Sequence, residues 1–147
     1  MQEWESTIIC WLEETMLKKI DHIGIAVHDI EETAKFYRDL LGMELQGVEE
    51  VENQKVKVAF FKIGETNIEL VMPTSEDSPV AKYLEKKGEG IHHICYATDN
   101  IEKAIEHMKA QGARLIDETP RPGAHGARVA FIHPKSSKGV LTELSQK

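Results

Sequence analysis

The chain has 147 residues, which suffices for one ordinary domain or for two small modules that share a core. Its formal net charge of -7 argues against general nucleic-acid binding, because phosphate neutralisation needs a basic surface. Hydrophobic residues make up 41% of the chain, but no run approaches the roughly 20 apolar residues that span a bilayer, so no membrane insertion is expected.

Residues 1–16 form an extension in front of the rest of the domain. Its apolar residues recur at helical spacing: Trp4, Ile8, Trp11 and Leu12. This spacing predicts a helical extension that packs on the body or on a neighbouring subunit. The segment is acidic and lacks the basic head of a secretory signal, and Cys10 and Cys95 lie far apart in the chain. We therefore expect no disulfide framework and a cytoplasmic protein.

A first module is predicted over residues 17–74. The strand-like run "HIGIAV" opens it, and Asp29 with Glu32 then fits a capping box at the start of a helix. Two apolar segments, 56–63 and 67–72, follow as a hairpin around "GETN", and "LQGVEEV" supplies a further strand. The predicted order is one strand, one helix and three strands.

A linker over residues 75–89, with a short helix at 79–87, leads to a second module over residues 90–147. The strand "HICYAT" opens this module, and Asp99 or Asn100 can cap the helix that follows. The segments "ARVAFIH" and "GVLTELS" make a hairpin, and "ARLIDE" supplies the further strand. The second module therefore has the same order of elements as the first.

The two modules are related by a shift of 71 residues along the chain. This shift places His22 on His93 and Ile23 on Ile94. Two halves of the same order and register are best explained by an internal duplication. Because each helix is followed by hairpins, the sheet is mixed or antiparallel, and the fold class is α+β.

The duplication repeats one histidine and one glutamate. His22 and His93 stand at the head of the opening strands, while Glu69 and Glu143 each precede a leucine in an apolar strand. A carboxylate in such a strand is costly unless it is paired or bound to a cation. A lone strand-end histidine is more often a core or surface residue, but the repeated pair favours a His2Glu2 site for a divalent ion such as Co, Mn, Ni, Zn or Fe. Because side chains alternate along a strand, His92 is expected on the opposite face.

Several segments carry a resemblance to a known family: "HIGIAV", "SPVAKYLEKKGEGIHHICY", "PRPGAHGARV" and "HPKSSKGVLTEL". Over residues 17–146 the chain resembles the methylmalonyl-CoA epimerases of the vicinal oxygen chelate superfamily. The resemblance implies one domain over 17–147, in which two tandem βαβββ modules form an open eight-stranded barrel-like mixed sheet around the metal site. It also implies a homodimer that uses Co, with Mn, Ni or Zn as the other candidate ions.

The resemblance implies that the two epimers of methylmalonyl-CoA are interconverted at C2, through an enolate that the divalent ion stabilises. It favours Glu143 for proton transfer, with Glu69 as the second candidate. Some relatives carry glutamine at the position of Glu69 and another glutamate on the strand that here is "KVKVAFF". The sequence therefore leaves the second acid/base group open.

Coenzyme A carries phosphates, which an acidic protein must meet with a local basic patch. The long second hairpin and nearby basic residues are the candidates for this patch: Lys135, Ser137, Lys138, Arg128 and Arg121. Taken singly, each lysine is equally well explained as a solvated surface residue.

Three other functions are compatible with the same scaffold. A glyoxalase I-type lyase, which would isomerise a glutathione hemithioacetal, also uses paired histidines and glutamates, but the hairpin "HPKSSKGVLTEL" argues against it. An Fe(II) extradiol dioxygenase needs two histidines and only one carboxylate. A metal-free drug-sequestering protein does not need the repeated pairs, so stoichiometric metal would distinguish it from the epimerase.

Overall fold

The computed structural model describes residues 16–147, which form one eight-stranded sheet with three helices. The strands are β1 (Leu17–Ala26), β2 (Glu44–Val51), β3 (Val56–Ile63), β4 (Thr66–Pro73), β5 (Gly90–Thr98), β6 (Arg121–Pro122), β7 (Arg128–Ile132) and β8 (Leu141–Gln146). The helices are α2 (Ile30–Ala34), α3 (Pro79–Lys87) and α4 (Ile101–Ala110), with helical turns η1 (Lys35–Leu40), η2 (Glu52–Gln54) and η3 (Ala124–Gly126). The predicted helical extension lies outside the described residues, apart from Met16.

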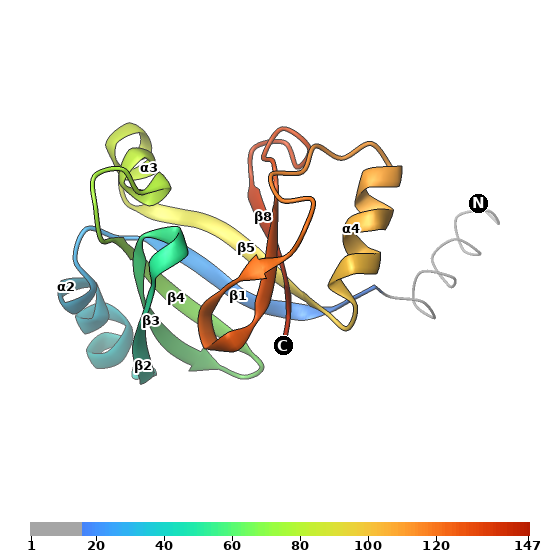
Figure 1. Cartoon of the computed structure of the whole chain (residues 1–147). Coiled ribbons are helices and arrows are strands. Elements are labelled where there is room, and N and C mark those ends of the chain that lie inside the picture. Colours follow the sequence, from blue (N-terminus) through green and yellow to red (C-terminus); the bar gives the residue numbers. More distant parts are fainter. Residues whose placement is uncertain (1–15) are drawn as a thin grey trace, which may run out of the picture.

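The order of the strands in the sheet shows the duplication directly (Figure 1). The order is β2-β3-β4-β1-β5-β8-β7-β6, so each strand of the first half has its counterpart at the mirrored place in the second half. The central strands β1 and β5 are antiparallel, while β1 pairs with β4 and β5 pairs with β8 in parallel. The predicted α+β class, with two tandem βαβββ modules and a mixed eight-stranded sheet, is confirmed.

Side-chain caps start the two repeated helices where the sequence predicted them. The Asp29 carboxylate accepts a hydrogen bond from the backbone N–H of Glu32 at 3.2 Å. In the second module the Asn100 side chain, rather than that of Asp99, accepts from the N–H of Lys103 at 3.0 Å. Each cap satisfies one of the orphan donors at a helix N-terminus, so both helices begin at a defined residue.

The helix of the first module is less regular than its spacing predicts. Its α-helical part ends at Ala34, and the chain continues to Leu40 as a π-helical turn. The N–H of Leu41 consequently donates to the carbonyl of Phe36, five residues back, at 3.0 Å. Such wider turns are rare and short in proteins.

The sheet curls until its two ends touch. The side-chain amide of Asn53 donates to the carbonyl of Pro122 at 2.9 Å. The N–H of His125, in η3, donates to the carboxylate of Glu49, on β2, at 3.1 Å. These contacts link η2 and β2 of the first module to β6 and η3 of the second, while β2 and β6 are not paired with each other, so the curled sheet forms the open barrel that was expected.

Alternation along β3 shows how both faces of the curled sheet are covered. Val58 and Phe60 face inward and belong to a buried cluster that also contains residues of α3. Ala59 and Phe61 face outward, in a buried cluster beneath α2. Successive side chains of a strand point to opposite faces, so a nearly continuous apolar run is required here.

The predicted strand "ARLIDE" is mostly absent. Leu115 makes one isolated bridge to Ile132, and β6 has only two residues. The Asp117 carboxylate accepts the N–H of Phe131 at 2.9 Å, where a regular neighbouring strand would offer a carbonyl.

Within residues 16–147 no helix has the length and apolar character needed to cross a membrane.

Candidate metal centre

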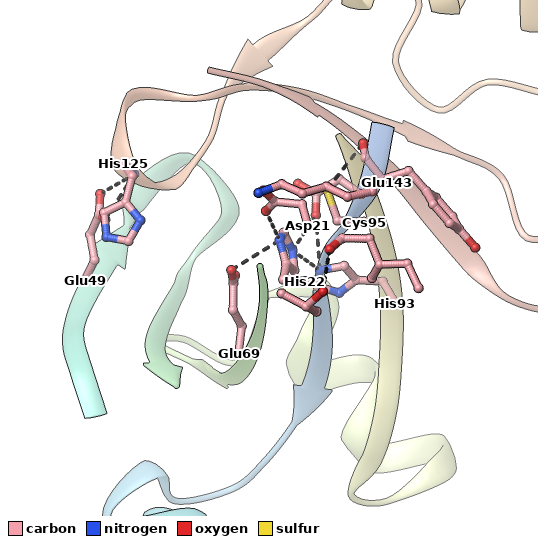
Figure 2. Close-up of polar contacts among 12 residues, drawn as sticks. Asp21, His22, Glu49, Glu69, His93, Cys95, His125 and Glu143 are labelled. Atoms are coloured by element: carbon pink, nitrogen blue, oxygen red, sulfur yellow. Dashed lines mark hydrogen bonds and ion pairs between the residues drawn. The ribbon is translucent and has the colours of Figure 1, made fainter. Parts of the chain in front are cut away.

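The four residues that the repeat singles out lie on the inner face of the four central strands (Figure 2). His22 is on β1, Glu69 on β4, His93 on β5 and Glu143 on β8. All four are buried, with 4 to 7% of their surface exposed. The parallel pairs β1–β4 and β5–β8 each bring one histidine-bearing strand beside one glutamate-bearing strand. The fold therefore gathers polar groups from both modules in its interior.

Three of the four side chains form one compact donor set. Nε2 of His22 lies 3.0 Å from Nε2 of His93 and 3.0 Å from Oε1 of Glu143. Nε2 of His93 lies 3.1 Å from the same carboxylate oxygen. Ligands at right angles around an ion, with bonds of about 2.1 Å, are about 3.0 Å apart. The spacing of these atoms therefore fits three adjacent ligands of a divalent metal ion, and imidazole with carboxylate suits a transition ion.

Glu69 lies beside this donor set rather than within it. Its Oε2 is 3.2 Å from Nδ1 of His22, the ring nitrogen on the far side from His93 and Glu143. Both glutamates line a small cavity of about 30 Å³ together with His22. A second potential donor group shares His22 and contains Asp21 and Cys95. The structure thus brings three predicted ligands into contact and places the fourth on the neighbouring wall.

The two glutamates have opposite electrostatic environments. Burial opposes ionisation of Glu143, but hydrogen bonds from His22 and His93 lower its pKa to about 2. Burial raises the pKa of Glu69 to about 7, although the nearby His22 partly offsets the increase. Burial also disfavours the charged form of His22, but hydrogen bonds to Asp21 and other neighbours raise its pKa well above the ordinary value. Glu143 thus stays anionic, as a ligand requires, while Glu69 can exchange a proton near neutrality.

His92 does not lie on the opposite face, so the prediction from strand alternation is wrong. The pairing of β5 with β1 skips His92, because His93 pairs with Gly24 and Ile91 with Ile25. This β-bulge turns His92 toward its neighbour, and the Nδ1 atoms of His92 and His93 are 3.0 Å apart. Of these two neighbouring rings, the ring of His93 is the one that contacts Glu143, at 3.1 Å.

A larger cavity of about 400 Å³ adjoins the donor set. Its wall includes His92 and His93 of β5, Phe131 of β7 and Val80 of α3. Arg121 also lines it, and its Nε has no hydrogen-bond partner among residues 16–147 although the Asp117 carboxylate is 3.3 Å away. A cavity of this volume has the size of a small-molecule site. It therefore provides space for a ligand next to the candidate metal ligands.

Comparison with known proteins places the chain in a family. Residues 21–131 match the glyoxalase/bleomycin resistance protein/dioxygenase superfamily, also called the vicinal oxygen chelate superfamily. The chain belongs to this superfamily. Within it, the chain is 42% identical over 133 residues to the ethylmalonyl-CoA/methylmalonyl-CoA epimerase of Cereibacter sphaeroides, covering 89% of this chain and 99% of that protein. It is 41% identical over 131 residues to the mitochondrial methylmalonyl-CoA epimerase of Homo sapiens, covering 88% and 74%.

Solved structures of the superfamily give the same result. A Streptomyces coelicolor methylmalonyl-CoA epimerase in complex with 2-nitronate-propionyl-CoA superposes with a TM-score of 0.86 and 42% identity, covering 89% of this chain and 95% of that one. The resemblance to methylmalonyl-CoA epimerases that the sequence motifs indicated is confirmed. The curled eight-stranded sheet is the fold of this superfamily.

The residues expected to meet coenzyme A phosphates are spread over two regions. Lys135 and Lys138 are exposed on the turn between β7 and β8, where the Ser137 hydroxyl lies within hydrogen-bond distance of two carbonyls, those of Pro134 and Val140, and can donate to either. Arg128 lies elsewhere. Its guanidinium is held by Glu102, of α4, and by the side chain of Gln146 at 2.9 Å. The structure therefore does not bring Arg128 to the two cavities, because an ion pair fixes it on the surface.

Sequence reasoning missed one contact near the site. Asp21 accepts a hydrogen bond from Nδ1 of His22 at 2.8 Å, and the repeat could have indicated it, since Asp21 is the counterpart of His92. His125 lines the small cavity and packs on Phe60 with ring centroids 4.2 Å apart. Its nearness depends on the curl of the sheet, which brings η3 to Glu49 on β2 (Figure 2).

Proposed function

We propose that this protein is a metal-dependent methylmalonyl-CoA epimerase, which inverts the configuration at C2 of the acyl group. The observation that carries the proposal is the set of three buried donor atoms, 3.0 to 3.1 Å apart, beside a cavity of about 400 Å³. Relatives at about 40% identity are named for this reaction, and related structures contain methylmalonyl-CoA or a close analogue.

His22, His93 and Glu143 would hold the ion, with Glu69 as the candidate fourth ligand on the adjoining wall. Cobalt is the proposed ion, with manganese, nickel and zinc as the alternatives that this nitrogen and oxygen donor set accepts. A divalent ion in this place supplies Lewis-acid stabilisation of the negative charge that develops when C2 loses its proton.

Epimerisation needs a proton to leave one face of C2 and another to reach the opposite face. Glu143 and Glu69 come from different modules and line the same small cavity beside His22, and together they are proposed to serve the two faces. Among relatives a further glutamate occurs on the strand equivalent to β3, but here Val58 is buried in an apolar cluster. We therefore propose that Glu69 is the second acid/base group, since its carboxylate lies beside the donor set, 3.2 Å from Nδ1 of His22.

The larger cavity would receive the acyl-CoA. Phe131 and Leu141 supply apolar wall, and the Arg121 guanidinium supplies positive charge, 36% of its side chain being exposed. The guanidinium also stacks over Phe131, with its Cζ 5.2 Å from the ring centroid, which holds it in place. Lys135 and Lys138 on the neighbouring turn are proposed to meet the outer phosphates, with Ser137 shaping that turn. We also propose that the enzyme acts in the cytoplasm as a homodimer.

The test supplies one epimer of methylmalonyl-CoA and measures the appearance of the other. A parallel assay supplies methylglyoxal with glutathione, which a glyoxalase I-type lyase would consume. We expect inversion of the acyl-CoA at a rate that requires one divalent ion per chain, and no turnover of the hemithioacetal. Turnover of the hemithioacetal alone would assign the chain to the lyases. Absence of both activities and of bound metal would favour the metal-free binding protein.

A further inference from the structure

Each histidine of the donor set is preceded by a residue that a β-bulge turns toward it. In the ladder between β1 and β5, Asp21 is the unpaired extra residue before His22, and His92 is the unpaired extra residue before His93. A bulge breaks the strict alternation of side chains, so neighbours can share one side of the sheet. The duplication therefore produces the same irregularity twice, at equivalent places beside the two histidines.

The two bulged residues contact the same ring atom in the two modules. Asp21 Oδ2 lies 2.8 Å from Nδ1 of His22, and Nδ1 of His92 lies 3.0 Å from Nδ1 of His93. In both histidines the other nitrogen, Nε2, is the one that faces Glu143. Each imidazole is thus held between the donor set on one side and its bulged neighbour on the other.

We propose that Asp21 and His92 are positioning residues, which fix the tautomer and the orientation of His22 and His93. A neutral imidazole that offers Nε2 to a metal must carry its proton on Nδ1. A buried N–H without an acceptor is costly, so an acceptor at Nδ1 stabilises this tautomer over the other one. The Asp21 carboxylate supplies that acceptor in the first module, and Nδ1 of His92 supplies it in the second. This inference rests on the metal centre of the proposed function.

Both partners are themselves fixed in place. The Asp21 side chain is only 13% exposed, and although Glu69 lies 3.2 Å from the same Nδ1, Asp21 is closer by 0.4 Å. The His92 ring packs edge-on against Tyr83 of α3, with centroids 4.8 Å apart, and the Tyr83 hydroxyl donates to the carbonyl of Ile91 at 2.8 Å. His92 therefore cannot turn away without losing its packing on Tyr83, and Asp21 is largely buried beside His22.

The two partners differ in charge, which predicts unequal effects. A carboxylate behind an imidazole raises its basicity as a ligand more than a neutral ring does. Removal of Asp21 should therefore weaken metal binding more than removal of His92. Loss of such an outer partner typically costs about 10 to 100-fold in metal affinity.

The test titrates Co²⁺ into the metal-free full chain and measures its dissociation constant calorimetrically. We expect Asp21→Ala and His92→Ala to bind about 10 to 100-fold more weakly, with the larger loss for Asp21→Ala. Asp21→Asn and His92→Asn keep an acceptor oxygen near the lost atom and should recover most of the affinity. His28→Ala, at an exposed histidine, is the matched control and should bind like the parent chain.

The imidazole ¹⁵N spectrum of the metal-free chain gives a second readout that needs no metal. In the parent chain Nδ1 of His22 and Nδ1 of His93 should each carry a proton that is hydrogen-bonded to Asp21 and to His92, and the His93 Nδ1 signal should shift in His92→Ala. Affinities within twofold of the parent, or no recovery with asparagine, would overturn the positioning role. If the parent chain binds no Co²⁺, the proposed function fails, and the ¹⁵N spectra alone then decide whether Asp21 and His92 set the tautomers.

Discussion

Replacement of Gly24 by alanine should disable the site while leaving the fold intact. A Cβ at this position on β1 would lie 2.1 Å from Cε1 and 2.4 Å from Nδ1 of His93. Ordinary contacts between carbon atoms are about 3.5 to 4.0 Å, so the His93 ring must move by about 1.4 Å or more. A misplacement of about 1 Å can cost about 100-fold in rate, and we expect a loss of that order both in Co²⁺ affinity and in epimerisation.

The fold should survive this change, because Gly24 does not have a positive φ and alanine can adopt its backbone conformation. Overpacking of this kind costs about 1 to 3 kcal/mol, less than the whole stability of an ordinary domain. Calorimetric titration, initial rates and thermal unfolding measure the three quantities separately. Gly47→Ala on β2 is the matched control, because no heavy atom lies within 4 Å of its added Cβ. If Gly24→Ala binds Co²⁺ and turns over like the parent, His93 is not held against β1 as the structure shows, and the reasoning is refuted.

Three further predictions concern proton transfer, pH and substrate binding. Glu143→Gln should keep much of its metal and lose about 100-fold or more in the rate of C2 proton exchange, whereas Glu69→Gln should lose less, because relatives use glutamine there. The reverse order would move the main base to the first module. Because burial raises the pKa of Glu69 from 4.5 to about 7, the folded metal-free chain holds a proton that the unfolded chain releases, and stability should fall as pH rises through that window. Urea unfolding should show a shallower decline for Glu69→Gln, and equal slopes would contradict the assignment. Arg121→Gln should raise KM for methylmalonyl-CoA about 10-fold with kcat little changed, while Arg128→Gln, at the ion pair with Glu102, should leave KM at the parent value.

The architecture was predictable because the duplication is visible in the sequence. The matched order of elements and the shift that places His22 on His93 required two equivalent halves. Carboxylates inside apolar strands then indicated that Glu69 and Glu143 face a shared polar interior. The structure brings all four residues together there. Glu69 contacts Nδ1 of the His22 ring, whereas His93 and Glu143 contact its Nε2. No sequence pattern could show this difference.

Local irregularities of the backbone account for what the sequence did not reveal. Strand alternation placed His92 on the wrong face, because a bulge depends on the register between β1 and β5 and leaves no mark in either strand alone. The segment "ARLIDE" has the composition of a strand, but the Asp117 carboxylate takes the N–H of Phe131 that a strand partner would bind. The cavity beside Arg121 likewise depends on the curl of the sheet, which brings segments from both modules around one space.

Deuterium exchange at C2 of methylmalonyl-CoA tests the central claim most directly. A single epimer is incubated with the enzyme in D2O, and deuterium at C2 is followed by mass spectrometry together with the configuration of the product. The account predicts that inversion is accompanied by deuterium at C2, that a chelator stops both, and that added Co²⁺ restores both. Exchange and inversion that continue undiminished in metal-free enzyme, or in His22→Ala, would contradict it.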